Sequence, residues 1–257
     1  MKNYNIFLFL PILFWGLFLS CNNVNAPKID EEYPTKLYPI DTSELEQLKS
    51  ECPYEIDKYG LINFAGIFSR GNSDIKDSDI VVDMAKKMIV KYSKFSNVFS
   101  ESSLSLKEIS NYNAIPELGI DWTVIFKNQI YEGLEILNTE IITIVQNNVS
   151  SIKGHHFNNI FIPRENLIPL EKIKENLVGK KIEYYCKQPR EIVITSDMIS
   201  NDITKKIFWK EIESYIEFRV VWRIPILPNN LQKIRFYLLV DVISGEIIEV
   251  QDTFICS

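Results

Sequence analysis

Residues 121–145 read DWTVIFKNQIYEGLEILNTEIITIV, and their apolar pattern decides the fold. Trp122, Val124 and Phe126 occupy alternate positions, and a period of two places such side chains on one face of a strand. Glu132-Gly133 interrupts the pattern, and glycine tolerates the positive φ that a tight turn requires. The second half of the stretch is apolar again and rich in Ile and Thr, which favour pleated strands. The stretch therefore predicts a long β-hairpin.

A second region of alternation lies near the C-terminus. Apolar residues at every second position from Ile216 to Ile224 predict a strand, and residues 234–242 predict the next. Ser244-Gly245 then predicts a turn into a last strand over 247–250. The alternation is strict enough to indicate sheets with one buried face.

Helical periodicity is confined to short segments between these strands. Asp77-Ser78-Asp79 opens an amphipathic stretch, and Pro169 and Gly179 bracket a second one. Ser43 with Glu46 has the form of a capping box and predicts a short helix that ends before Pro53. We expect an α+β fold of antiparallel sheets, each packed by a helix, in two tandem units.

Composition excludes some functions. The formal net charge of the 257 residues is −6, and no run of Lys and Arg stands out. A nucleic-acid partner is therefore not expected. At this length the chain forms one large domain or two small ones.

The N-terminus has the form of an export signal. Lys2 is followed by an apolar run over residues 6–19, which is shorter than the roughly 20 residues of a membrane-spanning helix. Polar residues follow at once from Cys21. We expect a signal peptide over residues 1–20 and a flexible tether over 21–40, where prolines recur without periodicity.

The end of this signal, Phe18-Leu19-Ser20-Cys21, resembles the lipobox of bacterial lipoproteins. The resemblance implies that Cys21 is lipidated and becomes the first mature residue, anchored to a bacterial membrane on its periplasmic or cell-surface face. Two acyl chains hold such an anchor firmly. The alternatives are a secretory signal cut after Val24-Asn25-Ala26, which Pro27 disfavours, and an uncleaved N-terminal anchor.

The two strand regions also resemble known modules. Trp222, Val240, Asp241, Gly245 and Glu246 match the strand and turn pattern of the PepSY domain. The following residues match the related propeptide domain of thermolysin-like and fungalysin proteases: Gln129, Tyr131, Gly133 and Leu134. The resemblance covers roughly residues 74–252, and we expect an N-terminal unit over 41–163 and a C-terminal PepSY-like unit over 164–257.

In those families the domains inhibit a protease in the same chain or help it to fold. The printed sequence contains no His-Glu-x-x-His motif. The resemblance therefore implies a module that acts on other proteins, as a binding or protease-modulating unit.

Sites for chemistry are scarce. His155 and His156 are the sole histidines, and adjacent strand residues point to opposite faces, so they are not expected to hold one metal. No nucleophile elbow and no phosphate-binding loop is present, and we expect no catalytic residue and no cofactor. Export would permit a disulfide between Cys52 and Cys256, whereas buried free thiols at Cys52, Cys186 and Cys256 are the alternative.

These observations favour a non-enzymatic, membrane-tethered binding module for a protein or peptide partner. An extended peptide could be held by a sheet edge or a concave sheet face. The alternatives are a hydrolase of the cell envelope, with His155 or a carboxylate in a cleft, and a purely structural envelope lipoprotein.

The lipid anchor gives a first test. Cys21→Ala removes the residue that would be acylated, so the mutant is expected to leave the membrane fraction and to lose incorporation of labelled fatty acid. Cys52→Ala serves as the matched control and should stay in the membrane. If the Cys21→Ala protein remains in the membrane with its label, the lipoprotein hypothesis is wrong.

Overall fold

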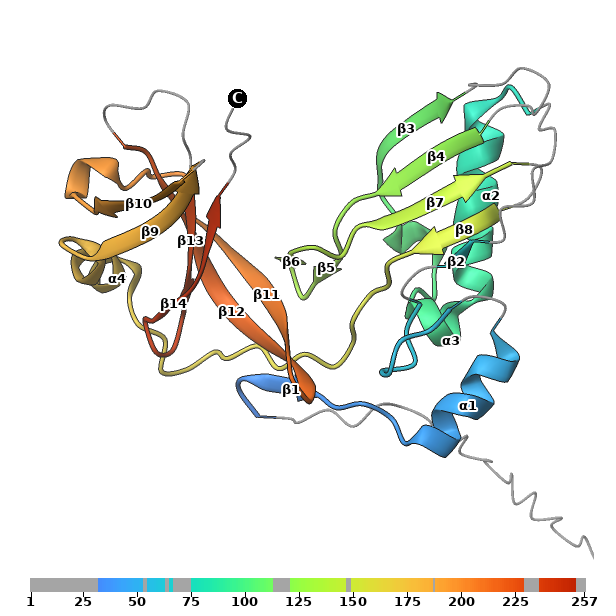
Figure 1. Cartoon of the computed structure of the whole chain (residues 1–257), viewed down its shortest axis with the longest axis horizontal. Coiled ribbons are helices and arrows are strands. Elements are labelled where there is room, and N and C mark those ends of the chain that lie inside the picture. The colour runs from blue at the N-terminus through green and yellow to red at the C-terminus, as the bar shows by residue number, and fades with distance from the viewer. Residues whose placement is uncertain are drawn as a thin grey trace, which may run out of the picture.

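Two sheets, each covered by a helix, form the two lobes of the chain, so the expected α+β fold is confirmed (Figure 1). The computed structural model describes residues 32–52, 55–62, 65–66, 75–112, 121–146, 149–186, 188–228 and 236–252. The predicted signal segment, Cys21 and Cys256 lie outside the described residues. Within those described ranges no helix has the length and apolar character of a membrane span.

The first lobe contains a five-stranded sheet in the order β2-β8-β7-β4-β3. Its strands are β2 (Ala65–Gly66), β3 (Leu106–Tyr112), β4 (Asp121–Phe126), β7 (Ile141–Val145) and β8 (Val149–Lys153). β4 pairs antiparallel with β7, with Phe126 opposite Ile141. The two halves of the predicted hairpin therefore do pair, although the connection between them is longer than a tight turn.

Helix α2 (Ser78–Lys91) covers one face of this sheet. Asp77 caps it by accepting a hydrogen bond from the Asp79 amide at 2.8 Å, as the acidic opening of the segment predicts. Val81, Ala85 and Ile89 face the sheet and are buried. Ile80 precedes this buried stripe and is 52% exposed. The short helix α3 (Ser93–Ser96) and a 3₁₀ turn η1 (Glu101–Ser103) follow.

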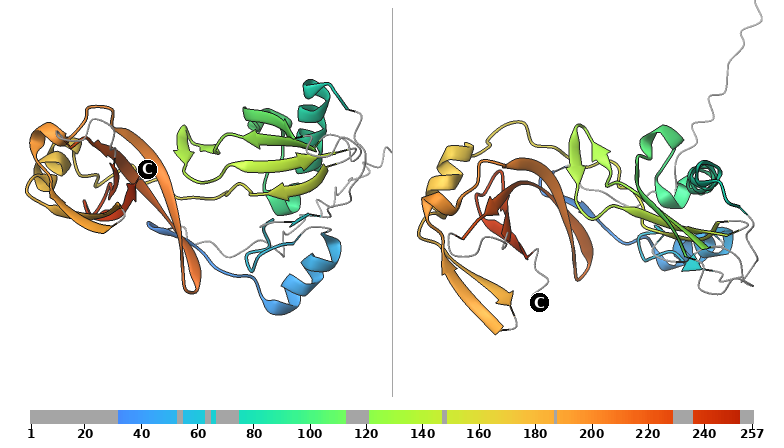
Figure 2. Two further views of the ribbon diagram at one scale, coloured as in Figure 1. Left: turned by 45° about the horizontal axis from the view of Figure 1, so that its top comes forward. Right: turned by 90° about the horizontal axis from the view of Figure 1, so that it is seen from above.

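The second lobe is built on a sheet of seven strands, whose main path is β14-β13-β12-β11-β6-β5 and in which β1 pairs with β12. Its strands are β1 (Thr35–Leu37), β5 (Ile130–Tyr131), β6 (Leu134–Ile136), β11 (Thr204–Ile212), β12 (Tyr215–Ile226), β13 (Phe236–Asp241) and β14 (Ile247–Asp252). The long strands β11 and β12 curve strongly (Figure 2). Phe218 and Phe236 are buried as predicted, whereas Trp222 is half-buried. β12 runs on through Pro225, where the sequence predicted that it would end.

Helix α4 (Leu170–Leu177) covers the second sheet and confirms the helix predicted between Pro169 and Gly179. Ile173 and Leu177 share an apolar cluster with Ile224 and Leu238. A separate two-stranded sheet of β9 (Lys181–Cys186) and β10 (Gln188–Val193) and a 3₁₀ turn η3 (Ser196–Met198) complete this lobe.

The two lobes are joined because strands that flank those of the first sheet in the sequence complete the second sheet. The β5–β6 hairpin lies within the connection from β4 to β7, and β6 pairs parallel with β11, with Ile136 opposite Ile207. The Leu137 amide donates to the Ile207 carbonyl at 2.9 Å, and the Trp209 indole donates to the Leu137 carbonyl at 2.9 Å. We call this segment, residues 129–139, the clasp.

β1 makes a second crossing between the lobes. Thr35–Leu37 pairs antiparallel with β12, so these residues of the segment predicted as a tether form a strand instead. Thr35 and Leu37 are buried in this strand. The composition of the segment did not predict this burial.

One further expectation was wrong. Helix α1 (Thr42–Glu51) starts after Asp41 and has no side-chain cap, so Ser43 is inside the helix and the capping box does not form. β3 forms after η1 in a polar stretch whose sequence shows no strand pattern. β8 ends at Lys153, where Gly154 turns the chain with φ 100°.

Removal of packing at the clasp tests its contribution. Ile136 and Ile207 are fully buried and face each other, so Ile136→Ala is expected to reduce the free energy of unfolding by about 2–5 kcal/mol. Urea unfolding followed by tryptophan fluorescence measures the change. Ile80→Ala on the exposed face of α2 is the control and should cost about 0.5 kcal/mol or less. Equal, small effects of the two substitutions would show that the clasp does not stabilise the fold.

Candidate functional site

The loop after β8 is held against the clasp by the Gln129 side chain. Its Nε2 donates to the Phe157 carbonyl at 2.6 Å, and its Oε1 accepts from the Phe157 amide at 2.7 Å. The backbone N–H of Gln129 donates to Thr139 Oγ1 at 2.9 Å. Gln129, which the family resemblance singled out, therefore fixes the loop by two hydrogen bonds at one residue.

The side chains of His155, His156 and Phe157 in this loop point to three different places. Gly154 begins the loop, and a Cβ there would collide with the Glu140 carbonyl. Phe157 packs in the core between the lobes, against Trp209 and Phe218. His155 lines a cavity between the lobes, whereas His156 lines a groove on the first lobe. The two histidines were predicted to point apart, and they do so although neither is on a strand.

The groove has a volume of about 760 Å³ and lies where the starts of β3 and β5 and the loop that contains His156 meet. We call it the His156 groove. It is lined by Asn97, Phe99, Ser100, Ser102, Ser103, Ser105, Lys107, Lys127, Asn128, Gln129, Ile130, Glu135, Glu140, His156 and Asn158. Phe99 is 68% exposed and Ile130 is 65% exposed. Large apolar side chains so close together on a surface indicate an interaction site.

Most polar groups of the groove are used within the protein. Asn128 donates to Glu135 and accepts from the Thr139 amide, at 2.7 and 2.8 Å. Lys206 pairs with Glu135 at 2.5 Å, and Lys107 pairs with Glu140 at 2.6 Å. The amides and the two carboxylates therefore hold the groove in shape.

His156 is the exception. It is 4% exposed, and its Nε2 is buried with no hydrogen-bond partner. Its backbone is fixed, since its amide donates to the Ser96 carbonyl at 2.8 Å and its carbonyl accepts from the Asn97 side chain at 3.1 Å. Burial, and to a smaller degree the proximity of His155, lowers the pKa of His156 to about 4. The ring is thus neutral at pH 7 and retains an unused hydrogen-bonding position.

His155 occupies a smaller cavity of about 360 Å³ between the lobes, together with Asp57, Tyr59, Trp209 and Glu211. Its Nδ1 lies 2.9 Å from the Ile62 carbonyl, and because a carbonyl accepts, Nδ1 carries the proton. Desolvation of the ring lowers the pKa of His155, against the opposing effects of this carbonyl and of Asp57. Lys58 neutralises Glu211 at 2.8 Å. The Lys58–Glu211 pair connects the lobes, and the described residues of the cavity wall include no serine.

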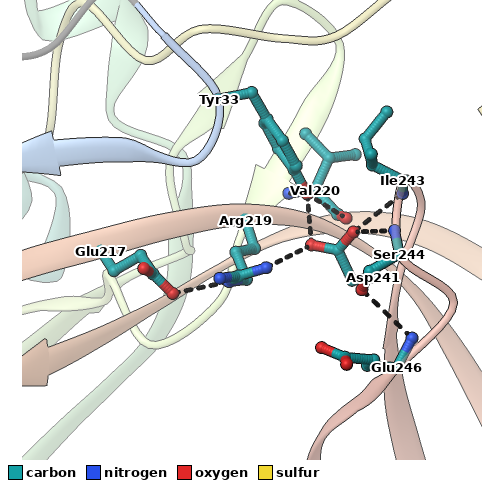
Figure 3. Close-up of polar contacts among 8 residues, drawn as sticks. All are labelled: Tyr33, Glu217, Arg219, Val220, Asp241, Ile243, Ser244 and Glu246. Atoms are coloured by element: carbon teal, nitrogen blue, oxygen red, sulfur yellow. Dashed lines mark hydrogen bonds and ion pairs between the residues drawn. The ribbon is translucent and has the colours of Figure 1, made fainter. Parts of the chain in front are cut away.

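The turn between β13 and β14 is organised by Asp241, which is fully buried and whose polar contacts Figure 3 shows. Its Oδ1 accepts from the amides of Ile243 and Ser244, both at 2.8 Å. Its Oδ2 accepts from Tyr33 Oη at 2.6 Å and from Arg219 at 3.1 Å. Asp241 thereby fixes the β13–β14 turn and ties the segment before β1 to the second sheet.

The ionisation of Asp241 follows from these contacts. Burial alone raises the pKa of this carboxyl group, but the hydrogen bonds from Tyr33, Ser244, Ile243 and Arg219 outweigh burial and hold the pKa below its usual value. The same burial, with the hydrogen bond to Asp241, raises the pKa of Tyr33, which stays protonated as a donor.

The structure describes one of the two cysteines of the predicted disulfide. Cys52 is buried in the core of the first lobe, and its proposed partner Cys256 is outside the described residues. Among the residues with described placement, no group of three or more His, Cys, Asp or Glu could hold a metal ion. Sequence reasoning missed Phe99, Lys127 and Ile130, because their separate positions in the sequence give no sign that they line one groove.

Fold and site together define an α+β protein with a surface groove of mixed apolar and polar character. No family model and no curated protein matches the chain. Among solved structures, the chain is similar to the C-terminal domain of YpeB from Bacillus megaterium, with 11% sequence identity and a TM-score of 0.34. That alignment covers 84% of this chain and 98% of the YpeB domain.

The Asp241 cluster predicts a pH dependence of stability. Because the folded-state pKa lies below the unfolded value near 3.8, the ionised carboxylate stabilises the fold above that pH. This contribution is lost as the pH falls through the folded-state pKa. Asp241→Asn is expected to cost about 1–3 kcal/mol at pH 7, and the difference from wild type should shrink below about pH 4.

Chemical unfolding at several pH values measures this difference. Asp202→Asn, at an exposed carboxylate of the same lobe, is the control and should differ from wild type by about 0.5 kcal/mol or less throughout. A cost of Asp241→Asn that stays constant down to pH 2 would contradict the proposed role of the ionised carboxylate.

Proposed function

We propose that the chain is an exported, membrane-tethered module that binds an extended segment of another protein in the His156 groove. The single observation that carries this proposal is the groove itself. Phe99 and Ile130 are more than half exposed there, beside the buried and unpartnered His156 Nε2. A site that combines exposed apolar side chains with a few fixed polar groups fits a ligand that offers both kinds of contact, as a peptide does.

The rigidity of the groove supports binding. Part of its wall comes from the clasp, where Gln129 and Glu135 already have partners within the protein. A preformed site loses little conformational entropy when a ligand binds, which favours affinity.

The proposed location of the module rests on the N-terminal sequence. The lipobox resemblance at Cys21 would place the groove outside the cytoplasm, at the end of a tether that precedes β1. The PepSY resemblance supports a role toward exported proteins, proteases among them. Such a role would be exerted on the protein whose segment the groove binds.

A hydrolase is the second candidate, and one observation favours it. The His156 groove brings a histidine, carboxylates and serines into one place. The geometry is not that of a nucleophile and base, because His156 Nε2 has no partner, Ser100 bonds Ser102 at 2.7 Å, and lysines neutralise both carboxylates. Labelling by a fluorophosphonate that Ser100→Ala or His156→Ala abolishes would establish the hydrolase instead.

Binding is tested by capture of exported proteins on the purified full chain. A photo-crosslinking residue at position 130 is expected to trap a partner, and Ile130→Ser should weaken capture by about tenfold, because exposed apolar anchors dominate such sites. Mass spectrometry identifies the trapped segment.

Ile80→Ser is the matched control, since Ile80 is an equally exposed isoleucine on α2 away from the groove. It should leave capture unchanged. If position 80 traps the same proteins as position 130, or if neither traps any, the proposed binding function is wrong.

A further inference from the structure

The charges of the His156 groove indicate which peptide it accepts. Of its four charged side chains, Glu135 and Glu140 are each neutralised by a lysine, Lys206 and Lys107 respectively. Lys127 is exposed and makes no ion pair with any residue whose placement is described. The groove therefore retains one positive charge without an acidic partner.

The backbone of β5 adds a second feature. β5 is the last strand in the path of the second sheet, and Ile130 lies opposite Glu135. The residues on either side of Ile130 carry the hydrogen bonds to β6. On one side, the Ile136 amide donates to the Gln129 carbonyl at 2.8 Å. On the other side, Tyr131 pairs with Leu134 across the two-residue turn. In an antiparallel pair the intervening residue directs its N–H and C=O away from the partner strand. Ile130 therefore offers a donor and an acceptor at the free edge.

The apolar and polar side chains nearby complete the set. Phe99 and the Ile130 side chain supply exposed apolar surface, and the neutral His156 ring supplies one unused hydrogen-bonding position. The side-chain amides of Asn128 and Gln129 hold the groove in shape, since each donates and accepts a hydrogen bond within the protein.

From these contacts we infer that the groove selects an extended peptide in which an acidic side chain stands beside apolar residues. The carboxylate pairs with Lys127, the peptide backbone bonds to Ile130, and the apolar side chains cover Phe99. This inference rests on the proposed peptide-binding function and specifies its ligand. An exposed ion pair contributes only modestly to affinity. We therefore expect the acidic residue to decide which peptide is selected more than how tightly it binds.

The test uses three capped peptides, Ac-Thr-Val-X-Val-Thr-NH₂ with Glu, Gln or Lys at X, immobilised and probed with the purified full chain. Capping removes the terminal carboxylate, so the side chain at X is the sole source of negative charge. The Glu peptide is expected to bind at least about threefold more tightly than the Gln peptide, and the Lys peptide most weakly. Raising the salt concentration should reduce the preference for Glu.

Lys127→Glu reverses the charge of the groove and is expected to reverse the order, so that the Lys peptide binds best. Lys172→Glu on the exposed face of α4 makes the same change of net charge in the other lobe and should keep the preference for Glu. Equal binding of the three peptides, or a preference for Glu that survives Lys127→Glu, overturns this inference alone. Binding of none of them overturns both the inference and its premise that the groove binds peptides.

Discussion

The fold depends on one constraint: the sheet of the second lobe is completed by strands that precede β7 of the first lobe in the sequence. β6 adds beside β11, and β1 adds beside β12. Each crossing buries apolar side chains at the joint, where Ile136, Ile207 and Phe218 share one cluster with Phe157. Since neither lobe can release these strands without exposing that cluster, the lobes stabilise each other.

The same constraint positions the candidate site. The clasp that adds to the second sheet is also the connection between β4 and β7, so its two ends are fixed by the first sheet. Gln129 then holds the loop of His156 and Phe157 against it through two hydrogen bonds. The His156 groove is thus a consequence of how the lobes are joined, and its shape does not rely on a ligand.

Local features of the fold could be predicted from the sequence, whereas the joint could not. Strict alternation located β4, β12 and β13, and the acidic opening located α2. β11 was missed because its two buried residues are adjacent: Ile207 lies in one cluster and Phe208 in another, so the apolar residues do not alternate. The pairing of β6 with β11 joins residues about seventy positions apart, and such a contact produces no periodic pattern in the local sequence. The groove has the same origin: His156 and Gln129 drew notice in the sequence, but the ion pairs that occupy Glu135 and Glu140 and leave Lys127 without an acidic partner among the described residues form in three dimensions.

Hydrogen exchange on the full chain tests most directly whether the clasp unites the lobes. The Leu137 amide, which donates to the Ile207 carbonyl, should exchange as slowly as the central amides of β12 and with the same dependence on denaturant. That result would show that the clasp opens only when the second sheet unfolds. Fast exchange at Leu137 and in β6, while the amides of β4 and β12 remain protected, would contradict the account and leave two lobes connected by a loose segment.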